Sequence, residues 1–324
     1  MQTYMHITFL NYINTVDFSF SNAKILLAIS GGKDSLALLR LMKDYQKIYK
    51  WKLGIIHCDH RWRTDSITNM QLIYQYAKEL NIDFYLVVNY KFLFTESTVR
   101  RWRYISFFNI AIKYNFNLLM TAHTATDEIE TFCHNLFRGT SINKLIALKN
   151  LKNIAPNLFL CRPLNFLFSN DIYWFCRHFY LPVWSDSTNF QHFIKRNRIR
   201  GELIPYLKQY FNPGVEKKIH LFLYSISLQN SYLQIQYQYV YKNLIHSKYV
   251  AIHICNYCKL NSYLQMTILQ MLLDQTNVFY SFDQVVLIKN FIVKHNYRKF
   301  ILTYELFRLV YKKNYIYFCY KNSI

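Results

Sequence analysis

The chain has 324 residues, enough for two domains, and carries 39 Lys and Arg residues against 18 Asp and Glu, a formal net charge of +21. This excess of positive charge favours a nucleic-acid partner over a membrane surface or a protein that is merely basic. No uninterrupted apolar run reaches the roughly 18 residues of a membrane-spanning helix, and seven irregularly spaced cysteines argue against a secreted disulfide scaffold.

Strand and helix patterns alternate through the first part of the chain, after a short helix predicted over residues 4–13. Apolar runs predict buried strands at Ile25–Ile29, Trp51–Cys58, Asp83–Val88 and Asn117–Thr121. Helical patterns follow at Asp34–Tyr49, Ser66–Leu80, Glu96–Tyr114 and Ala125–Phe137. This rhythm predicts an α/β fold with a doubly wound, mainly parallel sheet, whose ligands lie at the carboxyl ends of the strands.

One glycine-containing segment joins the first predicted strand to its helix: Ser30, Gly31, Gly32, Lys33, Asp34 and Ser35. Its glycines allow a sharp turn and a close backbone approach, and the new helix offers free N–H groups and the positive end of its dipole. Asp34 is suited to hold a hydrated magnesium ion or to cap the helix. The spacing differs from the Walker A and Gly-x-Gly-x-x-Gly patterns. A phosphate or pyrophosphate site is predicted, with an ordinary glycine-rich turn as the alternative.

Two further segments near the predicted strand ends are charged. The loop Asp59–Ser66 is consistent both with binding adenine, ribose or RNA and with a solvated loop capped by Ser66. On the third predicted helix, Glu96, Arg100 and Arg103 share one face. They form either a solvated salt-bridge stripe or a pair of guanidinium groups placed over phosphates.

The fourth predicted strand leads into a helix with an acidic face that includes Asp127 and Glu130. Two carboxylates at this edge are suited to hold magnesium or a lysine ammonium group. Charge complementing the helix dipole is the alternative, and it accounts for Glu130 less well than for Asp127. Farther along, Lys195–Arg200 has four basic residues in six, which indicates a phosphate-contacting patch or a solvated helix start.

Taken in order, these segments resemble the tRNA(Ile)-lysidine synthase family, over roughly residues 20 to 210. The Ser-Gly-Gly-x-Asp-Ser loop is that of the N-type (PP-loop) ATP pyrophosphatases, which split ATP between its α and β phosphates. The amino-acid sequence of Asp59–Ser66 is most similar to that of the cyanobacterial and plastid branch of this family. The other matching segments are Glu96–Tyr104, Thr121–His123, Asp127–Thr131, Arg138-Gly139, Arg162–Leu164, Asp186–Asn189 and Arg196–Arg200.

The resemblance implies a ligase that uses ATP and Mg²⁺ to join free L-lysine to carbon 2 of the wobble cytidine of tRNA(Ile) with a CAU anticodon, through an adenylated cytidine. It implies catalytic roles for Asp34, Arg100, Arg103, Asp127 and Glu130, and magnesium binding by Asp34 and Glu130. Nucleotide contacts would come from Ser30, Gly31, Gly32, Lys33, Asp34, Ser35, His57 and His123. Contacts with tRNA would come from Arg138, Arg196, Arg198 and Arg200.

The chain is expected to divide into a PP-loop catalytic domain over residues 1–210 and a helical linker with a tRNA-binding domain over residues 211–324. In the second part, Leu221–Leu244 has the character of a long helix. A small sheet is predicted from Phe300–Tyr304, Phe307–Tyr311 and Tyr315–Tyr320, with a turn at residues 312–314. For Cys255 and Cys258, an inert pair is favoured over a metal site because no second such pair is present.

No signal or transit peptide is recognised, and the composition suggests AT-rich coding. We therefore expect a plastid-encoded protein of the stroma, with the bacterial cytoplasm as the alternative and a homodimer left open. Two other functions stay open: a PP-loop tRNA thiolase, and a non-catalytic RNA-binding protein that retains a relict ATP fold. Synthetases that make NAD or GMP would not need this surface charge.

Overall fold

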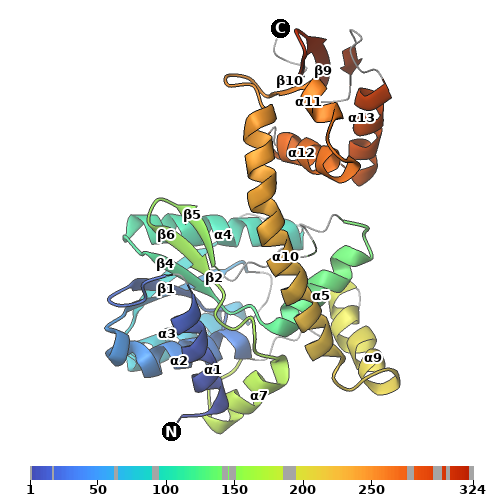
Figure 1. The fold of residues 1–324 in the computed structure, drawn as a ribbon. Helices are drawn as coiled ribbons and strands as arrows, with labels where there is room; N and C mark the ends of the chain where they lie inside the picture. Colours follow the sequence, from blue (N-terminus) through green and yellow to red (C-terminus); the bar gives the residue numbers. More distant parts are fainter. Residues whose placement is uncertain are drawn as a thin grey trace. The chain divides into compact units, whose positions relative to one another are not determined.

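The computed structural model describes residues 2–16, 18–61, 65–89, 95–140, 145, 151–184, 195–275, 281–294, 301–303 and 307–320. The predicted segment Asp186–Asn189 and part of the loop Asp59–Ser66 lie outside these residues. The chain divides into two compact units, residues 1–139 with 145–221, and residues 140–144 with 222–324. Figure 1 shows the elements of both units in chain colours.

The first unit contains a six-stranded sheet in the order β3-β2-β1-β4-β6-β5. All neighbouring strands run parallel except β5, which is antiparallel to β6. At the centre of the sheet, Leu27 of β1 pairs with Ile55 on one side and Met120 on the other. The strands are β1 Lys24–Ala28, β2 Lys52–Asp59, β3 Asp83–Val88, β4 Leu118–Thr121, β5 Leu151–Ala155 and β6 Leu158–Cys161. The predicted α/β fold with a mainly parallel sheet is confirmed.

Helices cover both faces of this sheet. The helices of the first unit are α1 Tyr4–Thr15, α2 Lys33–Tyr49, α3 Ser66–Glu79, α4 Glu96–Lys113, α5 Ala125–Leu136, α7 Ser169–His178, α8 Lys195–Arg198, the π-helix η2 Ile199–Leu203 and α9 Ile204–Tyr210. Helix α10, Val215–Leu244, begins in the first unit and continues into the second. Every predicted element before Phe137 is present, with ends that differ by one or two residues.

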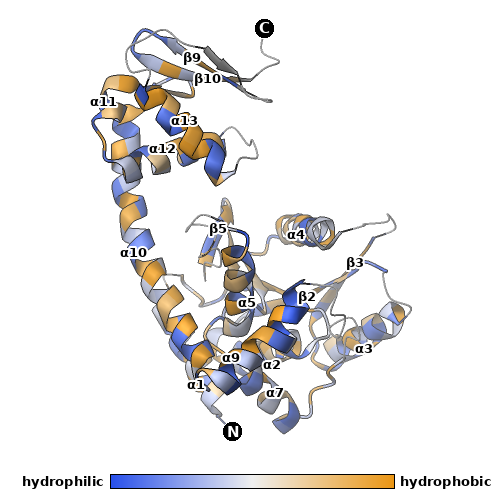
Figure 2. Ribbon diagram, turned by 90° about the vertical axis from the view of Figure 1, so that its right-hand side faces the viewer, coloured by the Kyte–Doolittle hydropathy of each residue, from blue (hydrophilic) through white to orange (hydrophobic). Residues whose placement is uncertain are grey.

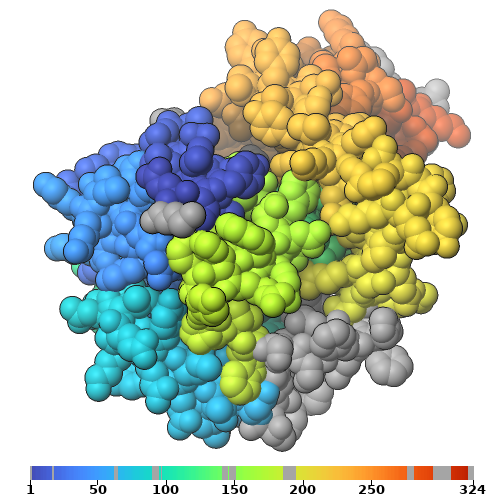
Figure 3. All heavy atoms as spheres, turned by 90° about the horizontal axis from the view of Figure 1, so that it is seen from below, coloured from blue at the N-terminus to red at the C-terminus, as the bar shows by residue number. Residues whose placement is uncertain are grey.

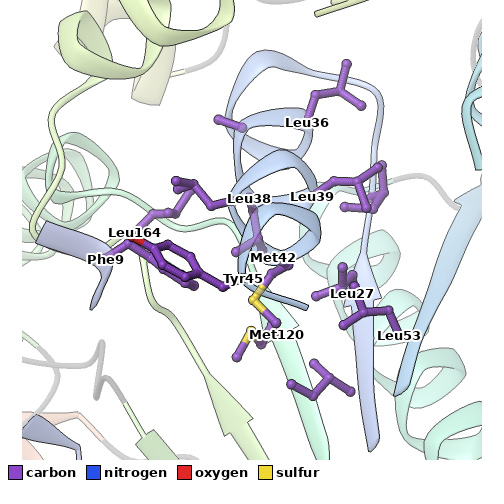
Figure 4. Packing of buried hydrophobic residues seen from close by; sticks show 14 of the residues in the cluster. Phe9, Leu27, Leu36, Leu38, Leu39, Met42, Tyr45, Leu53, Met120 and Leu164 are labelled. Carbon is purple, nitrogen blue, oxygen red and sulfur yellow. The ribbon is translucent and has the colours of Figure 1, made fainter. Parts of the chain in front are cut away.

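Side chains alternate between the two faces of β1, as expected for a strand covered on both sides. Ile25 and Leu27 pack into a core with α1, α2, α3 and α7, whereas Leu26 packs against α4 on the opposite face. Figure 4 shows the first core, where Leu38, Leu39 and Met42 of α2 meet the sheet. Figure 3 shows α1, in dark blue, beside the lime-coloured α7. These layers fix the position of the loop between β1 and α2.

The hairpin of β5 and β6 is absent from the sequence-based predictions. Its first strand exposes Lys152 and Asn153 and lacks the apolar run by which buried strands are recognised. The turn at Pro156 and Asn157, where Asn157 has φ of +61°, returns the chain so that β6 extends the parallel part of the sheet.

The second unit combines helices with a four-stranded sheet in the order β7-β10-β9-β8. Lys313 and Asn314, with φ of +49° and +65°, form the tight turn between β9 and β10, as predicted. Figure 2 shows hydrophobic and hydrophilic residues alternating along α10. The remaining elements are β7 Ala251–His253, α11 Ile254–Cys258, α12 Ser262–Gln275, α13 Phe282–Lys294, β8 Ile301–Thr303, β9 Phe307–Lys312 and β10 Tyr315–Tyr320.

Cys255 and Cys258 are free thiols on α11 and pack beside the core of the second unit. Within the described parts of the chain, no three His, Cys, Asp or Glu side chains gather as a metal site would require. In the same residues, no helix has both the length and the apolar character needed to cross a membrane.

We predict that Gly54→Ala destabilises the protein by about 1–3 kcal/mol, the usual cost of overpacking a core. A Cβ atom at this position of β2 would lie 2.7 Å from Cζ of the buried Phe116 and 3.1 Å from Tyr85. Urea unfolding of the two proteins measures the difference. The double variant Gly54→Ala/Phe116→Leu should recover part of the loss, because leucine lacks the ring that clashes. Equal stability of Gly54→Ala and the parent would contradict the packing described.

Candidate functional site

The loop between β1 and α2 is held by hydrogen bonds among its own residues. The Ser35 hydroxyl donates to the Gly32 carbonyl at 2.8 Å and accepts from the Ser30 backbone N–H at 3.3 Å. Gly31 has φ of +92°, and a Cβ atom there would lie 2.2 Å from Oδ1 of Asn69. Only glycine suits this backbone conformation and this space.

Two segments from elsewhere in the chain hold the loop by donating hydrogen bonds to its backbone carbonyls. The Asn69 side-chain amide on α3 donates to the Ser30 carbonyl at 3.0 Å, and the Trp184 backbone N–H donates to the Gly31 carbonyl at 3.0 Å. No described side chain caps α2 at Gly32. The first N–H groups of a helix have no acceptor within the helix. The start of α2 therefore presents backbone donors and a positive dipole end to an anion.

A pocket of about 400 Å³ opens where β1, β2 and β4 end. The chain runs from β1 outward to β2 and β3 on one side, and then crosses from β3 to β4 on the other side of β1, so the pocket lies at the point where the winding reverses. Ten of the predicted site residues line it: Ser30, Gly32, Asp34, Ser35, His57, Arg100, Arg103, His123, Asp127 and Arg196.

Asp34 places a carboxylate at the start of α2 beside this pocket. Burial raises the pKa of Asp34, the Asp127 carboxylate adds to the rise, and Lys33 and Arg200 oppose it. Its buried Oδ1 lies 3.5 Å from Nζ of Lys33 but has no hydrogen bond to any described residue. Mg²⁺ is a hard cation that binds one or two carboxylates together with phosphate oxygens. A buried carboxylate oxygen without a hydrogen bond, next to backbone donors for phosphate, suits such an ion.

His57 and His123 contribute neutral rings to the pocket. His57 Nδ1 lies 2.8 Å from the Ile29 carbonyl and therefore donates to it, which leaves Nε2 as an acceptor. Burial lowers the pKa of His57. Burial also lowers the pKa of His123, and the neighbouring arginines Arg162, Arg100 and Arg196 lower it further. Neither ring is suited to carry positive charge near neutral pH.

Arg100 and Arg103 approach the pocket from α4. The Arg100 guanidinium lies 5.8 Å from the ring centre of Tyr104, on the next turn of the helix. The Tyr104 ring also lines the pocket, and its buried hydroxyl has no hydrogen-bond partner among the described residues. Two positive groups and a free hydroxyl therefore stand opposite the start of α2, where charge on a bound phosphate ester would be neutralised.

The acidic face of α5 is occupied by arginines that lie about seventy residues farther along the chain. Arg196 donates to Asp127 at 2.9 Å and to Glu130 at 2.8 Å. Arg200 lies 2.5 Å from Glu130 and 3.4 Å from Asp127. The Glu130 side chain is fully buried. In this arrangement the two carboxylates are neutralised within the protein.

Asp127 has a second task as part of the helix cap. Its Oδ2 accepts from the Thr124 backbone N–H at 2.9 Å and from the Thr124 hydroxyl at 3.0 Å. Burial alone would raise the pKa of Asp127, but Arg196 and the Thr124 N–H hold it below its usual value. Asp127 therefore complements the N-terminus of α5 in this structure, which is the alternative that the sequence left open for this residue.

Six predicted site residues lie outside the lining of this pocket. Lys33 donates from Nζ to the carbonyl and the hydroxyl of Ser169 on α7. Gly31 shapes the loop from behind, and Glu130 and Arg200 lie in the ion-pair cluster. Arg138 and Arg198 line a second pocket near the end of α5, where Arg198 is paired with Glu202.

No pattern in the sequence predicts several residues that support the site. Asn69 and Ser169 act through contacts across the fold, with Ser30 and Lys33 respectively, and no local pattern marks them. Glu128 points away from the pocket and binds His220 of α10 at 3.0 Å. Each of these contacts joins elements that are distant in the sequence.

Comparisons with known proteins find relatives over much of the chain. The family model of the PP-loop domain matches residues 1–207. The chloroplastic tRNA(Ile)-lysidine synthase of Gracilaria tenuistipitata var. liui is 36% identical over 320 residues, which cover 97% of this chain and 98% of the relative. The chloroplastic enzyme of the same name from Pyropia yezoensis is 39% identical and covers 78% and 76%. The tRNA(Ile)-lysidine synthase of Nostoc sp. is 44% identical and covers 61% and 58%.

Among solved structures, the U34-tRNA thiolase NcsA from Methanococcus maripaludis, with its 4Fe–4S cluster, aligns with a TM-score of 0.58 at 16% identity. The alignment covers 68% of this chain and 77% of the thiolase. This likeness shows a shared fold.

We predict opposite stability effects for two carboxylates of the pocket. The folded-state pKa of Asp34 is raised above its ordinary value of 3.8, so its ionised form costs stability at neutral pH, and the cost disappears as the pH falls below 3.8. Asp34→Asn should therefore raise the thermal midpoint at pH 7 by a few degrees, which corresponds to a gain of about 1 kcal/mol in the free energy of unfolding.

Asp127 is the matched comparison, because its folded-state pKa is lowered. Its contribution to stability is present above 3.8 and is lost as the pH falls through the folded-state pKa, so Asp127→Asn should lower the midpoint at pH 7, and this loss should shrink as the pH falls below 3.8. Thermal unfolding of both variants from pH 7 to pH 3 measures these effects. A lower midpoint for Asp34→Asn at pH 7 would show that Asp34 has a structural role.

Proposed function

This chain belongs to the tRNA(Ile)-lysidine synthase family, and we propose that it uses ATP to convert the wobble cytidine of tRNA(Ile) with a CAU anticodon to lysidine. Family membership agrees with the resemblance inferred from the motifs. The observation that carries the proposal is the glycine loop at the start of α2, which opens into a pocket that also contains Asp34, Arg100 and Arg103. Donors for phosphate and groups that neutralise its charge thus face one cavity.

The first chemical step joins the base to AMP. The oxygen on carbon 2 of cytosine attacks the α-phosphorus of ATP, an oxygen–phosphorus bond forms, and the bond to the pyrophosphate breaks. Such a transfer depends on positioning and on charge stabilisation more than on covalent help from the protein. We propose that the start of α2 and the hydroxyls of Ser30 and Ser35 hold the phosphates, and that Arg100 and Arg103, which line the same pocket, stabilise charge as pyrophosphate leaves.

A magnesium ion bound with ATP would supply further neutralisation of the phosphate charges. Asp34 is the residue best suited to hold it, because its buried Oδ1 has no hydrogen bond to a described residue. Glu130 is less suited in this arrangement, since both of its oxygens accept from arginines.

The second step transfers the base from AMP to lysine. The ε-amine attacks carbon 2, a carbon–nitrogen bond forms, AMP leaves and the amine loses a proton. An uncharged amine is needed, so a carboxylate must bind the ammonium group and accept a proton. Asp127 and Glu130 are suited to this if the lysine ammonium replaces the guanidinium groups of Arg196 and Arg200, which occupy the same oxygens here.

The proposed function also implies which parts of the chain contact the tRNA. Arg138, Arg196, Arg198 and Arg200 are proposed to contact tRNA. Arg196 and Arg200 would exchange their ion pairs with Asp127 and Glu130 for phosphate contacts when RNA binds. The second part of the chain is proposed to bind tRNA as well. Chloroplastic relatives support a plastid location for this chain.

A thiolase function is less well supported. Sulfur transfer needs a reactive thiolate, and such thiols have lowered pKa values. Cys58 lines the pocket, but burial raises the pKa of its thiol to about 12. Burial also raises the pKa of the other three cysteines of the first unit, Cys133, Cys161 and Cys176.

We predict that the purified chain, given ATP and Mg²⁺, incorporates radiolabelled lysine into a tRNA(Ile) transcript with a CAU anticodon. A transcript with uridine in place of the wobble cytidine is the control, because uracil lacks the exocyclic amine by which cytosine is distinguished. Lysine that fails to enter the first transcript, or enters both equally, would refute the proposed function. Binding of tRNA without incorporation would favour the relict RNA-binding alternative.

We predict that Glu130→Gln slows lysine transfer by about a hundredfold, the usual contribution of a general base. Pyrophosphate release without lysine, which reports the first step, should change much less. Glu128→Gln is the matched control, since Glu128 is also buried on α5 but binds Asn165 and His220 away from the pocket. Equal slowing of both steps in Glu130→Gln would mean that Glu130 serves folding or ATP binding, and equal effects of the two variants would exclude a specific role.

A further inference from the structure

A second cavity of the first unit lies outside the ATP pocket. It has a volume of about 580 Å³ and is formed by the end of α5 with α8, η2 and α9. Ile199, Leu203 and Tyr206 supply apolar surface, and Phe137 lies at the end of α5. This volume falls in the range of pockets that hold small organic groups.

Two aromatic side chains of this cavity are more than half exposed. Phe137 is 67% exposed and Tyr206 is 53% exposed. Large exposed rings on a soluble protein commonly mark a binding surface. The exposed face of such a ring can stack on an unpaired nucleobase, which is how proteins hold single-stranded RNA.

The charge around the cavity suits the same ligand. Arg138, Lys195 and Arg198 line it together with His134. Among the described lining residues, Glu202 is the acidic one, and it is neutralised by Arg198 at 3.0 Å. Cationic groups around an aromatic floor complement the phosphates and the bases of an RNA strand, and they do not favour an apolar protein partner.

Two elements connect this cavity to the ATP pocket. Helix α5 carries Asp127 in the first pocket and Phe137 in the second, ten residues and about 15 Å apart along the axis. Helix α8 carries Arg196 in the first pocket and Lys195 and Arg198 in the second. A ligand bound in one cavity is therefore a few nucleotide lengths from a ligand bound in the other.

We propose that this cavity binds a second unstacked base of the anticodon loop, a neighbour of the wobble cytidine, which stacks on Phe137 between cations that contact its phosphates. The proposal rests on the proposed function, because it takes the RNA that the first pocket modifies as its ligand. Its role is to fix the register of the loop, so that the wobble base and no other enters the ATP pocket.

The test combines one protein variant with a scan of the RNA. Full-length tRNA(Ile) transcripts, each with a single abasic nucleotide in the anticodon loop outside the wobble position, are titrated against the full chain and Phe137→Ala. With the parent chain, one abasic position should raise Kd about tenfold, the size of one base–aromatic stack. With Phe137→Ala, Kd for the intact tRNA should rise about tenfold and that abasic position should have no further effect.

Tyr4→Ala is the matched control, since Tyr4 on α1 is also 67% exposed but lies outside the cavity, and it should bind every transcript as the parent does. An unchanged Kd for Phe137→Ala, or the same loss for every transcript, would overturn the base-binding proposal while lysidine formation by the parent chain still stood. Loss of a dimer in Phe137→Ala with unchanged RNA binding would assign the cavity to a second copy of the chain. Failure of the parent chain to form lysidine would instead refute the proposed function.

Discussion

The backbone of Gly31 is the constraint on which the pocket at the ends of β1, β2 and β4 depends. Its positive φ turns the chain out of the central strand and into α2, and the contact with Asn69 leaves no room for a side chain. Because β1 is paired with β2 on one side and β4 on the other, the turn lies where the chain winding reverses. The start of α2, the neutral His57 and the Asp34 carboxylate are placed around one cavity as a result. A displaced loop would separate the phosphate donors from the arginines of α4.

Buried charge is distributed unequally between the two sides of this pocket. Asp127 and Glu130 are satisfied by Arg196 and Arg200, whereas Asp34 retains an oxygen with no hydrogen bond to the described residues. Breaking a satisfied buried pair is costly, whereas Asp34, whose ion pair with Lys33 is 3.5 Å long, has an oxygen that can accept a metal ion. The proposed reaction requires both conditions in turn: a cation beside the phosphates in the first step, and carboxylates that exchange their partners for an amine in the second.

The fold and half of the site could be predicted because their signals are local. Apolar runs and helical periodicity mark the elements from β1 to α5, and chemically suitable residues such as Asp34 and His123 stand just after buried strands. The strand β5 lacks an apolar run, so its hairpin could not be recognised. The pairing of Arg196 and Arg200 with Asp127 and Glu130 joins segments about seventy residues apart, and a sequence pattern contains no measure of that distance. Arg138 and Arg198 match the motifs as well as Arg196 does. For the same reason, the sequence could not show that these two residues line the second cavity.

The burial of the thiols has a consequence for chemical durability. Peroxide and alkylating agents react with the thiolate form of cysteine, and burial raises the pKa of all four thiols in the first unit. Cys161 is fully enclosed and lies 3.1 Å from the Tyr12 hydroxyl, so an oxidant has no path to it without opening the core. In a compartment that generates reactive oxygen, Cys161 should therefore stay reduced for as long as the first unit stays folded.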